Sequence, residues 1–328
     1  MIKDVSFVVV ARNEEFAVDK CLRAILSLPL ENCEVIAVDS ASTDGTLDIM
    51  KRYAAASNAI SVFSFNGHLN AAIARNIGLK SARKKYICFC DGDTEWEGNF
   101  VRQALTLMEA GEADAVTGSL KEIVYSHSYK KILETSDRIS YPTRTAIYHC
   151  GGNFMVRKKI ADKTGLWDER MVRNQDIDYT LRVSRYGRFI GIPVLMGTHH
   201  TQTYDERLWD FLKNDRLRAH GALIRKNLDR PKALTALLIE NRGFLAGYIF
   251  FSLCLVLLCM RLIISSIPTY ILLAPLCFLL ADLLWCFSRG KGALKRFATH
   301  YCYIPSIIRG LFFGAGPYPS GISVKQIV

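Results

Sequence analysis

The sequence predicts an α/β domain with a mostly parallel β-sheet, followed by a C-terminal hairpin of two transmembrane helices. In the N-terminal part, short β-branched and aromatic runs alternate with segments whose apolar residues recur at helical spacing. From residue 243 onward two apolar stretches of roughly 20 residues each replace this pattern, long enough to span a hydrocarbon core. The 328 residues, half of them hydrophobic, allow about two domains.

Four apolar runs are predicted to be strands buried on both faces. They are SFVVV (6–10), EVIAVD (34–39), ISVFSF (60–65) and YICFC (86–90). Strands about 25 residues apart with helical segments between them are typical of βαβ units and a parallel sheet.

The helical segments between these strands are recognised by apolar or small residues three and four positions apart. Their members are Val18, Cys21, Leu22, Ile25 and Leu26 in the first segment, Leu47, Met50 and Ala54 in the second, and Ala71, Ala74, Ile77 and Gly78 in the third. A further helix is predicted over IDYTLRVSR (177–185).

Polar residues gather where three of the predicted strands end. The first strand runs into ARNE (11–14), the second into DSASTDGT (39–46) and the fourth into DGD (91–93). Taken singly, each stretch is also good capping or turn sequence. Because ligands of parallel α/β sheets bind outside the carboxyl ends of the strands, three such stretches at one edge favour a binding site.

Two carboxylates flank a glycine at the end of the fourth strand. Asp91 and Asp93 repel one another, and a divalent cation with hard oxygen ligands, Mg²⁺ or Mn²⁺, relieves that repulsion. The chain has neither a GxxxxGK[ST] loop nor a GxGxxG after its first strand. A nucleoside diphosphate held through the metal is therefore the predicted ligand.

Six segments in order resemble the motifs of family 2 glycosyltransferases, in particular their membrane-anchored bacterial and archaeal members. They are VVVARNEE (8–15), VDSASTDGT (38–46), AAIARNIGL (71–79), CDGDTEWEGN (90–99), GGNFMVRKK (151–159) and GLWDERMVRNQDIDYTLRVSRYG (165–187). The resemblance implies the GT-A fold, a Rossmann-like catalytic domain, and sugar transfer with inversion at the anomeric carbon.

The resemblance also implies roles for matching positions. Ala11, Arg12 and Glu14 line the nucleotide pocket, Asp39 contacts the base, and Arg75 lies near the ribose or phosphates. Asp91 and Gly92 also belong to the donor site. The DxD motif places the metal on Asp93, the more direct ligand, and Asp91, with a downstream histidine, His200 or His199, as a further ligand.

The resemblance places the catalytic base at Asp176. The family usually has a Glu-Asp pair at this point, and Gln175 replaces the first carboxylate here. A carboxylate in this position removes the proton of the acceptor hydroxyl as the new bond forms. If Asp176 begins the predicted helix, the alternative role is that of an N-cap. Residues predicted to shape the sugar and acceptor side are Trp96, Gly152, Asn153 and Gln175.

The remainder of the chain is predicted to attach this domain to a membrane. The predicted boundaries are 1–204 for the catalytic domain, 205–242 for a basic amphipathic juxtamembrane linker, 243–288 for two transmembrane helices and 289–328 for a basic interfacial segment. Asp282 is the unexpected acid in the second apolar stretch, either a helix-contact residue or a functional one.

Charge and cysteine content indicate the cellular location of the protein and the class of its binding partners. The net charge of +11 is concentrated in bases on both sides of the apolar stretches, which favours anionic lipid over nucleic acid and places both flanks in the cytoplasm. The N-terminal apolar run is too short for a signal peptide. The ten cysteines lack disulfide-framework or zinc spacing and are predicted to be reduced. We therefore expect a multi-pass protein of the cytoplasmic membrane, with its catalytic domain in the cytoplasm.

The predicted function is transfer of one sugar from a UDP- or GDP-type donor to a lipid-linked glycan during polysaccharide or glycoconjugate biosynthesis. Transfer to polyprenyl phosphate is the second possibility. The Gln-x-x-Arg-Trp motif of processive synthases is absent, which argues against polymer synthesis. A sugar nucleotidyltransferase would need a Gly-rich basic loop where ARNEEFAV stands. A catalytically silent membrane scaffold stays open because of Gln175.

Overall fold

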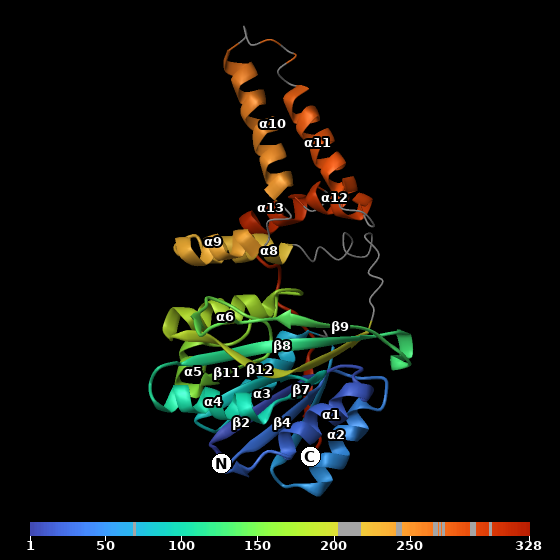
Figure 1. Ribbon diagram of the computed structural model, residues 1–328, viewed down its shortest axis with the longest axis vertical. Coiled ribbons are helices and arrows are strands. Elements are labelled where there is room, and N and C mark those ends of the chain that lie inside the picture. The colour runs from blue at the N-terminus through green and yellow to red at the C-terminus, as the bar shows by residue number, and fades with distance from the viewer. Residues whose placement is uncertain are drawn as a thin grey trace. The chain divides into compact units, whose positions relative to one another are not determined.

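The computed structural model describes residues 1–67, 70–202, 218–240, 245–264, 268, 270, 273–288, 293–301 and 304–328. The chain forms two compact units (Figure 1). The first contains residues 1–205 together with 317–328, and the second contains residues 206–316. The predicted sheet lies in the first unit and the two long apolar helices lie in the second.

The four predicted strands are confirmed. They are β2 (Val5–Ala11), β4 (Glu34–Asp39), β5 (Ile60–Asn66) and β6 (Tyr86–Asp91). They run parallel in the order β6-β2-β4-β5, so their carboxyl ends meet at one edge. Helices α1 (Glu15–Leu26), α2 (Thr46–Ala56) and α3 (Ala71–Ser81) follow β2, β4 and β5 respectively.

The rest of the sheet is mixed, which corrects the prediction of a mostly parallel one. Strand β11 (Phe154–Arg157) pairs antiparallel with β6 and β8 (Ala115–Tyr125), and β12 (Phe189–Gln202) runs parallel to β8. Shorter or edge strands complete the sheet: β7 (Thr94–Trp96) and β10 (Thr145–Ala146) on β12, and β9 (Ile132–Ile139) on β8. A second, two-stranded sheet pairs β1 (Ile2–Lys3) with β3 (Leu30–Glu31).

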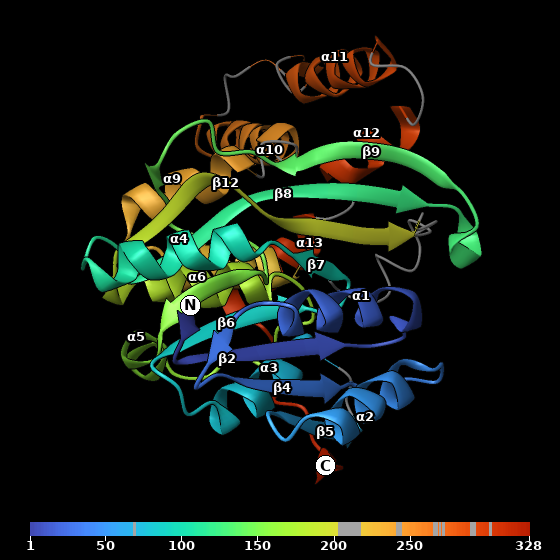
Figure 2. The same ribbon diagram turned by 60° about the horizontal axis from the view of Figure 1, so that its bottom comes forward.

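Helices cover both faces of the sheet and bury two apolar layers. Helices α1, α2 and α4 (Gly98–Glu109) pack on one face (Figure 2), and α3, α5 (Lys158–Thr164) and α6 (Gln175–Tyr186) pack on the other. All seven residues of β2 are buried, as a central parallel strand requires. A Cβ on Gly78 would lie 2.1 Å from Val8 Cγ1, so glycine lets α3 approach β2 closely.

The last twelve residues return to the first unit, which corrects the prediction of one interfacial segment over 289–328. Strand β13 (Ser323–Gln326) pairs antiparallel with β5, from Ser323 opposite Asn66 to Gln326 opposite Phe63. The backbone of Ile327 donates to Val62 O at 2.7 Å. The chain end therefore covers the outer edge of the parallel strands, an edge that would otherwise be unpaired.

The second unit is helical. Its described helices are α8 (Arg218–Lys226), α9 (Pro231–Glu240), α10 (Leu245–Ile263), α11 (Ala274–Ser288), α12 (Ala293–Tyr301) and α13 (Ile304–Phe313). Both predicted apolar helices form, as α10 and α11, and the segment 293–313 holds α12 and α13. The part of the predicted linker before Arg218, residues 205–217, lies outside the described residues.

The prediction of two membrane-spanning helices is not supported. Within the described ranges, no helix combines the length and the hydropathy needed to cross a bilayer. For α11 the physical reason is length, since 15 residues at about 1.5 Å each reach roughly 22 Å of a core about 30 Å thick.

Candidate active site

Two loops at the carboxyl edge of the sheet are hydrogen-bonded to each other. Asn13 has a left-handed backbone, with φ of 56°, and its Oδ1 accepts from the Thr43 backbone at 2.8 Å. The Asn13 and Glu14 backbone amides donate to Ser42 Oγ at 3.0 Å and to Thr46 Oγ1 at 2.8 Å. The loop after β2 is therefore held in place by the loop after β4. Neither α1 nor α2 has a side-chain cap hydrogen bond from its N-cap residue, Glu14 or Gly45, so capping does not explain these contacts.

Asp39 supports the second loop. Its side chain is 1 % exposed, and both carboxylate oxygens accept from the Ser42 amide, at 3.2 and 3.3 Å. Ser64 Oγ donates to the same carboxylate at 3.1 Å. These bonds stabilise the turn at the start of the loop after β4. Contact of Asp39 with the nucleotide base stays a prediction.

A pocket of about 240 Å³ opens beside these loops. It is lined by Val10, Ala11, Arg12, Glu14, Ser40, Asn70, Ala71, Asp91, Gly92 and Asp93. The structure thus brings together six of the predicted donor and metal residues. Asp39 and Arg75 are not among the residues that line the pocket. Asn70 was missed in the sequence, although it stands directly before the AAIARN motif and caps α3 by accepting from the Ala72 amide at 2.8 Å.

Asp91 is held on both of its oxygens. Arg75 Nη2 lies 2.5 Å from Oδ1, and Asn153 Nδ2 donates to Oδ2 at 3.1 Å. The Asp91 backbone amide donates in turn to Asn153 Oδ1 at 2.7 Å. A Cβ on Gly152 would lie 2.2 Å from Arg75 Nη2 and 2.8 Å from Asp91 Oδ2, so only glycine fits beside this ion pair.

Arg75 itself is buried in an aromatic stack. Its guanidinium carbon lies 4.7 Å from the centre of the Trp167 ring, and Trp167 stacks on Tyr179 at 4.1 Å and 2°. Arg75 is only 5 % exposed. The cation–π contact and the Asp91 carboxylate together compensate the charge of a guanidinium removed from water.

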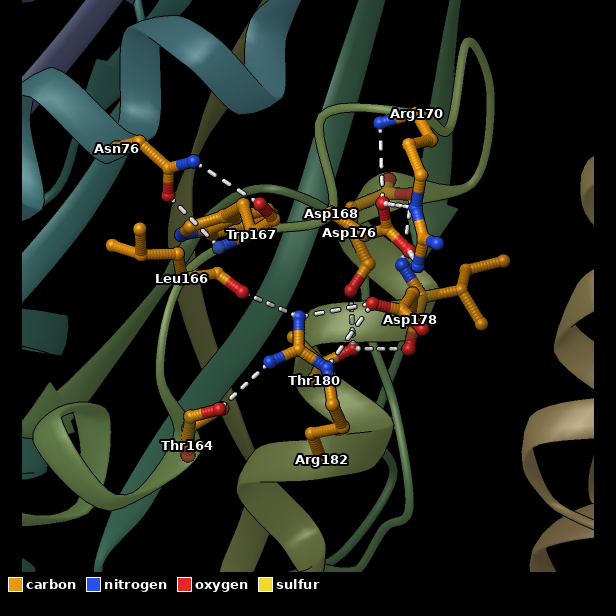
Figure 3. A network of polar contacts seen from close by, with 11 residues as sticks. Asn76, Thr164, Leu166, Trp167, Asp168, Arg170, Asp176, Asp178, Thr180 and Arg182 are labelled. Carbon is orange, nitrogen blue, oxygen red and sulfur yellow. Dashed lines mark hydrogen bonds and ion pairs between the residues drawn. The ribbon is translucent and has the colours of Figure 1, made fainter. Parts of the chain in front are cut away.

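The segment that carries Trp167 is anchored at both ends (Figure 3). Asn76 of α3 donates to Trp167 O at 3.0 Å and accepts from its amide at 2.8 Å. Arg182 donates to Thr164 O and Leu166 O at 2.7 and 2.9 Å while pairing with Asp178 at 2.9 Å. Asp178, 1 % exposed, is thus part of this anchor and does not line the pocket.

The two adjacent histidines point in different directions. His199 Nε2 lies 3.0 Å from Asp93 Oδ2, and its Nδ1 lies 3.2 Å from Glu122 Oε1. His200 instead lies 3.0 Å from the Tyr125 hydroxyl and 3.2 Å from Glu95, and only its backbone reaches Asp93, donating to O at 2.8 Å. The geometry therefore favours His199 over His200 as the partner of Asp93.

Asp176 lies in the first turn of α6, across a glycine pair from Asp91. Thr180 Oγ1 bonds the Asp176 carbonyl at 2.7 Å and the Cys150 backbone at 3.1 Å, which ties α6 to the start of that pair. A Cβ on Gly151 would lie 3.9 Å from Asp176 Oδ2, while Gly152 touches Asp91. Gln175 is the first residue of the same helix. The N-cap position belongs to Asn174, so the capping alternative for Asp176 is wrong.

The predicted acceptor-side role of Trp96 is not supported by its position. Trp96 is 3 % exposed, belongs to the apolar core and packs on Phe100 with ring centres 5.8 Å apart. Its strand pairs with β12, and that pairing turns the indole inward. Trp96 is therefore a packing residue, whereas Gly152 and Asn153 lie at the Asp91 carboxylate.

The carboxylates of the pocket raise each other's proton affinity. Burial raises the pKa of Glu14 to about 8, with further contributions from Asp93, Asp91 and Asp44. Burial also raises the pKa of Asp91, and Asp93 adds to the effect against the opposing charge of Arg75. Burial lowers the pKa of His199, but the hydrogen bond and charge of Asp93 outweigh it, so the net shift is upward. Such a group of acids and an imidazole suits a divalent cation.

Family models match most of the chain. The model described as glycosyl transferase family 2 matches residues 6–165, and that described as glycosyl transferase family group 2 matches residues 86–286. The chain is 27 % identical over 216 residues to the amylovoran biosynthesis glycosyltransferase AmsB of Erwinia amylovora, covering 62 % of this chain and 72 % of that protein. It is 22 % identical to the glycosyltransferase AglE of Haloferax volcanii, covering 62 % and 69 %.

Solved structures share the fold. Residues 1–349 of S. aureus TarS, in complex with UDP-GlcNAc, match with a TM-score of 0.55 and 16 % identity over 94 % of this chain and 93 % of that one. The mannosyltransferase PcManGT of Pyrobaculum calidifontis, in complex with GDP-Man and Mn²⁺, matches with a TM-score of 0.57 and 15 % identity over 94 % and 87 %.

Gly152→Ala is expected to reduce catalysis strongly, because the new methyl group would displace Arg75 or Asp91. A misplacement of about 1 Å at a reacting centre costs about 100-fold in rate. Steady-state kinetics with a nucleotide-sugar donor measure the loss. Gly151→Ala is the matched control and should lose much less, since its methyl group meets only Asp176 Oδ2 at 3.9 Å. Equal losses in both variants would contradict the steric argument.

Glu14→Gln is expected to stabilise the metal-free protein above about pH 8. A carboxyl whose pKa is raised from 4.5 to about 8 on folding costs stability as pH rises through that window, and glutamine removes this cost. The melting temperature of Glu14→Gln should exceed that of the native chain by an amount that grows between pH 4.5 and about 8. This difference should reach at least about 2–4 °C, the shift expected for about 1 kcal/mol.

A divalent cation should reduce the difference in melting temperature between Glu14→Gln and the native chain, because it compensates the charge of Glu14 in the native protein. Glu109→Gln, which removes an exposed glutamate at the end of α4, is the control for a general effect of charge. A difference that stays constant from pH 4.5 to 8 would show that Glu14 does not titrate in this window.

Proposed function

The chain belongs to the family 2 glycosyltransferases, and from this premise we propose that it transfers one sugar from a nucleoside diphosphate sugar to an acceptor hydroxyl. One observation carries the proposal. Asp176 of α6 lies near Gly151 and Asp91 of the DxD motif lies near the adjacent Gly152, while Asp91 and Asp93 line the pocket. The donor is of UDP or GDP type, by analogy with the TarS and PcManGT complexes.

The pocket residues would hold the donor. Three of them come from the end of β2 and the loop after it, namely Ala11, Arg12 and Glu14, and Ser40 comes from the loop after β4. Asp93, with His199 beside it, would hold Mg²⁺ or Mn²⁺, because Arg75 already compensates the charge of Asp91. When bound, the cation supplies positive charge against the leaving diphosphate. Arg75 and Asn153 keep Asp91 in place at the same site.

Asp176 would act as the general base. It takes the proton of the acceptor hydroxyl while the new glycosidic bond forms and the bond to the diphosphate breaks. Displacement in one step inverts the anomeric carbon, so a second carboxylate nucleophile is not required. The replacement of the usual glutamate by Gln175 removes one charge next to this base and leaves the base itself in place.

The acceptor is proposed to be a lipid-linked glycan at the cytoplasmic face of a membrane, with polyprenyl phosphate as the second candidate. Large apolar side chains stand exposed on α10 and α11, among them Leu255 at 62 %, Leu262 at 77 % and Leu284 at 70 %. Exposed apolar surface of this extent favours contact with lipid. The role of AmsB in amylovoran biosynthesis, as its name gives it, agrees with a polysaccharide pathway.

Asp176→Asn is expected to lower transfer by about 100- to 10,000-fold, the usual contribution of a general base. The full chain is assayed in membranes with a panel of nucleotide sugars and lipid extract as acceptor, with Mn²⁺ or Mg²⁺ and with chelator. Release of the nucleoside diphosphate measures turnover, and donor binding should be unaffected by this change. Asp162→Asn, an exposed aspartate on α5, is the matched control.

A silent scaffold would give a different result. It would turn over no donor in the native form, and both variants would be indistinguishable from it. Retention of full transfer in Asp176→Asn would assign the base to another residue.

A further inference from the structure

Three donor side chains of different kinds meet in the second unit, and none of them belongs to the glycosyltransferase site. Asp282 and Cys286 lie one turn apart on α11, and His300 faces them from α12. Cys286 is fully buried, His300 is 5 % exposed and the Asp282 side chain is 9 % exposed. Asp282 is the unexpected acid of the second apolar stretch, and it has no role in the proposed sugar transfer.

The distances among these donors resemble those of a tetrahedral metal shell. His300 Nδ1 lies 2.9 Å from Asp282 Oδ2 and 3.9 Å from Cys286 Sγ, and the three ligand atoms lie within 4.8 Å of one another. Tetrahedral Zn²⁺ bonds of about 2.0–2.3 Å separate ligand atoms by roughly 3.3–3.6 Å. Because the three ligand atoms lie within 4.8 Å of one another, side-chain movements of about 1 Å would place all three around one ion.

We propose that Asp282, Cys286 and His300 form a Zn²⁺ site, with water at the fourth position. The mixture of carboxylate, thiolate and imidazole suits zinc, whereas Mg²⁺ and Ca²⁺ prefer oxygen ligands alone. Binding would release the Cys286 thiol proton to solvent and leave the imidazole proton on Nε2 of His300. The hydrogen bond between His300 Nδ1 and Asp282 is the metal-free arrangement of the same pair.

The site lies where three helices meet, which gives the ion a structural role. A Cβ on Gly247 of α10 would lie 1.9 Å from His300 O, and the rings of Phe250 and Tyr301 are 5.4 Å apart. Helix α12 has only nine residues, and isolated helices of that length are marginal in water. A metal bond from His300 to α11 would fix α12 against its neighbours.

Cobalt substitution tests the site on the full chain. Metal is removed with a chelator and Co²⁺ is added, and absorption is recorded in the near ultraviolet and visible. We expect thiolate-to-cobalt charge transfer and the intense visible bands of tetrahedral Co²⁺, with one zinc per chain found by elemental analysis of the untreated protein. The Asp93 site offers oxygen and nitrogen ligands, so a sulfur band distinguishes the new site from that one.

Two variants on one helix sharpen the result. Cys286→Ser should abolish the sulfur band, whereas Cys277→Ser, an exposed cysteine of α11, should keep it. Asp93→Asn should also keep it. Absence of the band from the native chain, or its survival in Cys286→Ser, would overturn the proposal and leave a hydrogen-bonded aspartate–histidine pair beside a thiol.

A measurement on the unmodified chain tests the site without depending on whether Cys286→Ser folds. Zn²⁺ should slow alkylation of Cys286, located by peptide mass analysis, and chelator should restore the rate. A rate at Cys286 that does not respond to Zn²⁺ would also overturn the proposal.

Discussion

The active site depends on the ion pair between the buried Arg75 and the partly buried Asp91. A guanidinium at the centre of an α/β domain is costly unless its charge is compensated, and removing one partner of such a pair costs about 3–5 kcal/mol. The surroundings of Arg75 provide that compensation: Trp167 stacks on it, Gly152 leaves room for it, and Asn153 holds the other oxygen of Asp91. Because Trp167 is fixed through Asn76, and its segment through Arg182 to Asp178, the pair links α3, β6 and α6 in one network.

This pairing gives the two DxD carboxylates different tasks. Both aspartates line the pocket, but Arg75 already compensates the charge of Asp91, whereas Asp93 lies beside His199. We therefore propose that Asp91 orients the site and that Asp93 binds the cation. The short Gly151-Gly152 segment joins this arrangement to Asp176, so the proposed metal site and the proposed base are fixed by the same backbone.

The sequence predicted the parallel strands and the residues at their carboxyl ends because continuous apolar runs followed by acids and amides are local features. It did not resolve the histidine pair, because successive strand residues point to opposite faces and the choice depends on the register of β12 with β7. The buried position of Trp96 depends on that same register. The return of the chain end to β5 depends on pairing between residues far apart in sequence, for which four exposed residues of β13 carry no signal.

Binding of Mn²⁺ in the presence of a nucleoside diphosphate, followed by electron paramagnetic resonance, tests the division between the two aspartates most directly. The account predicts that Asp93→Asn abolishes nucleotide-dependent Mn²⁺ binding, while Asp91→Asn, which keeps a hydrogen-bonding oxygen for Arg75, weakens it without abolishing it. Loss of binding in Asp91→Asn with retention in Asp93→Asn would contradict the account and make Asp91 the metal ligand.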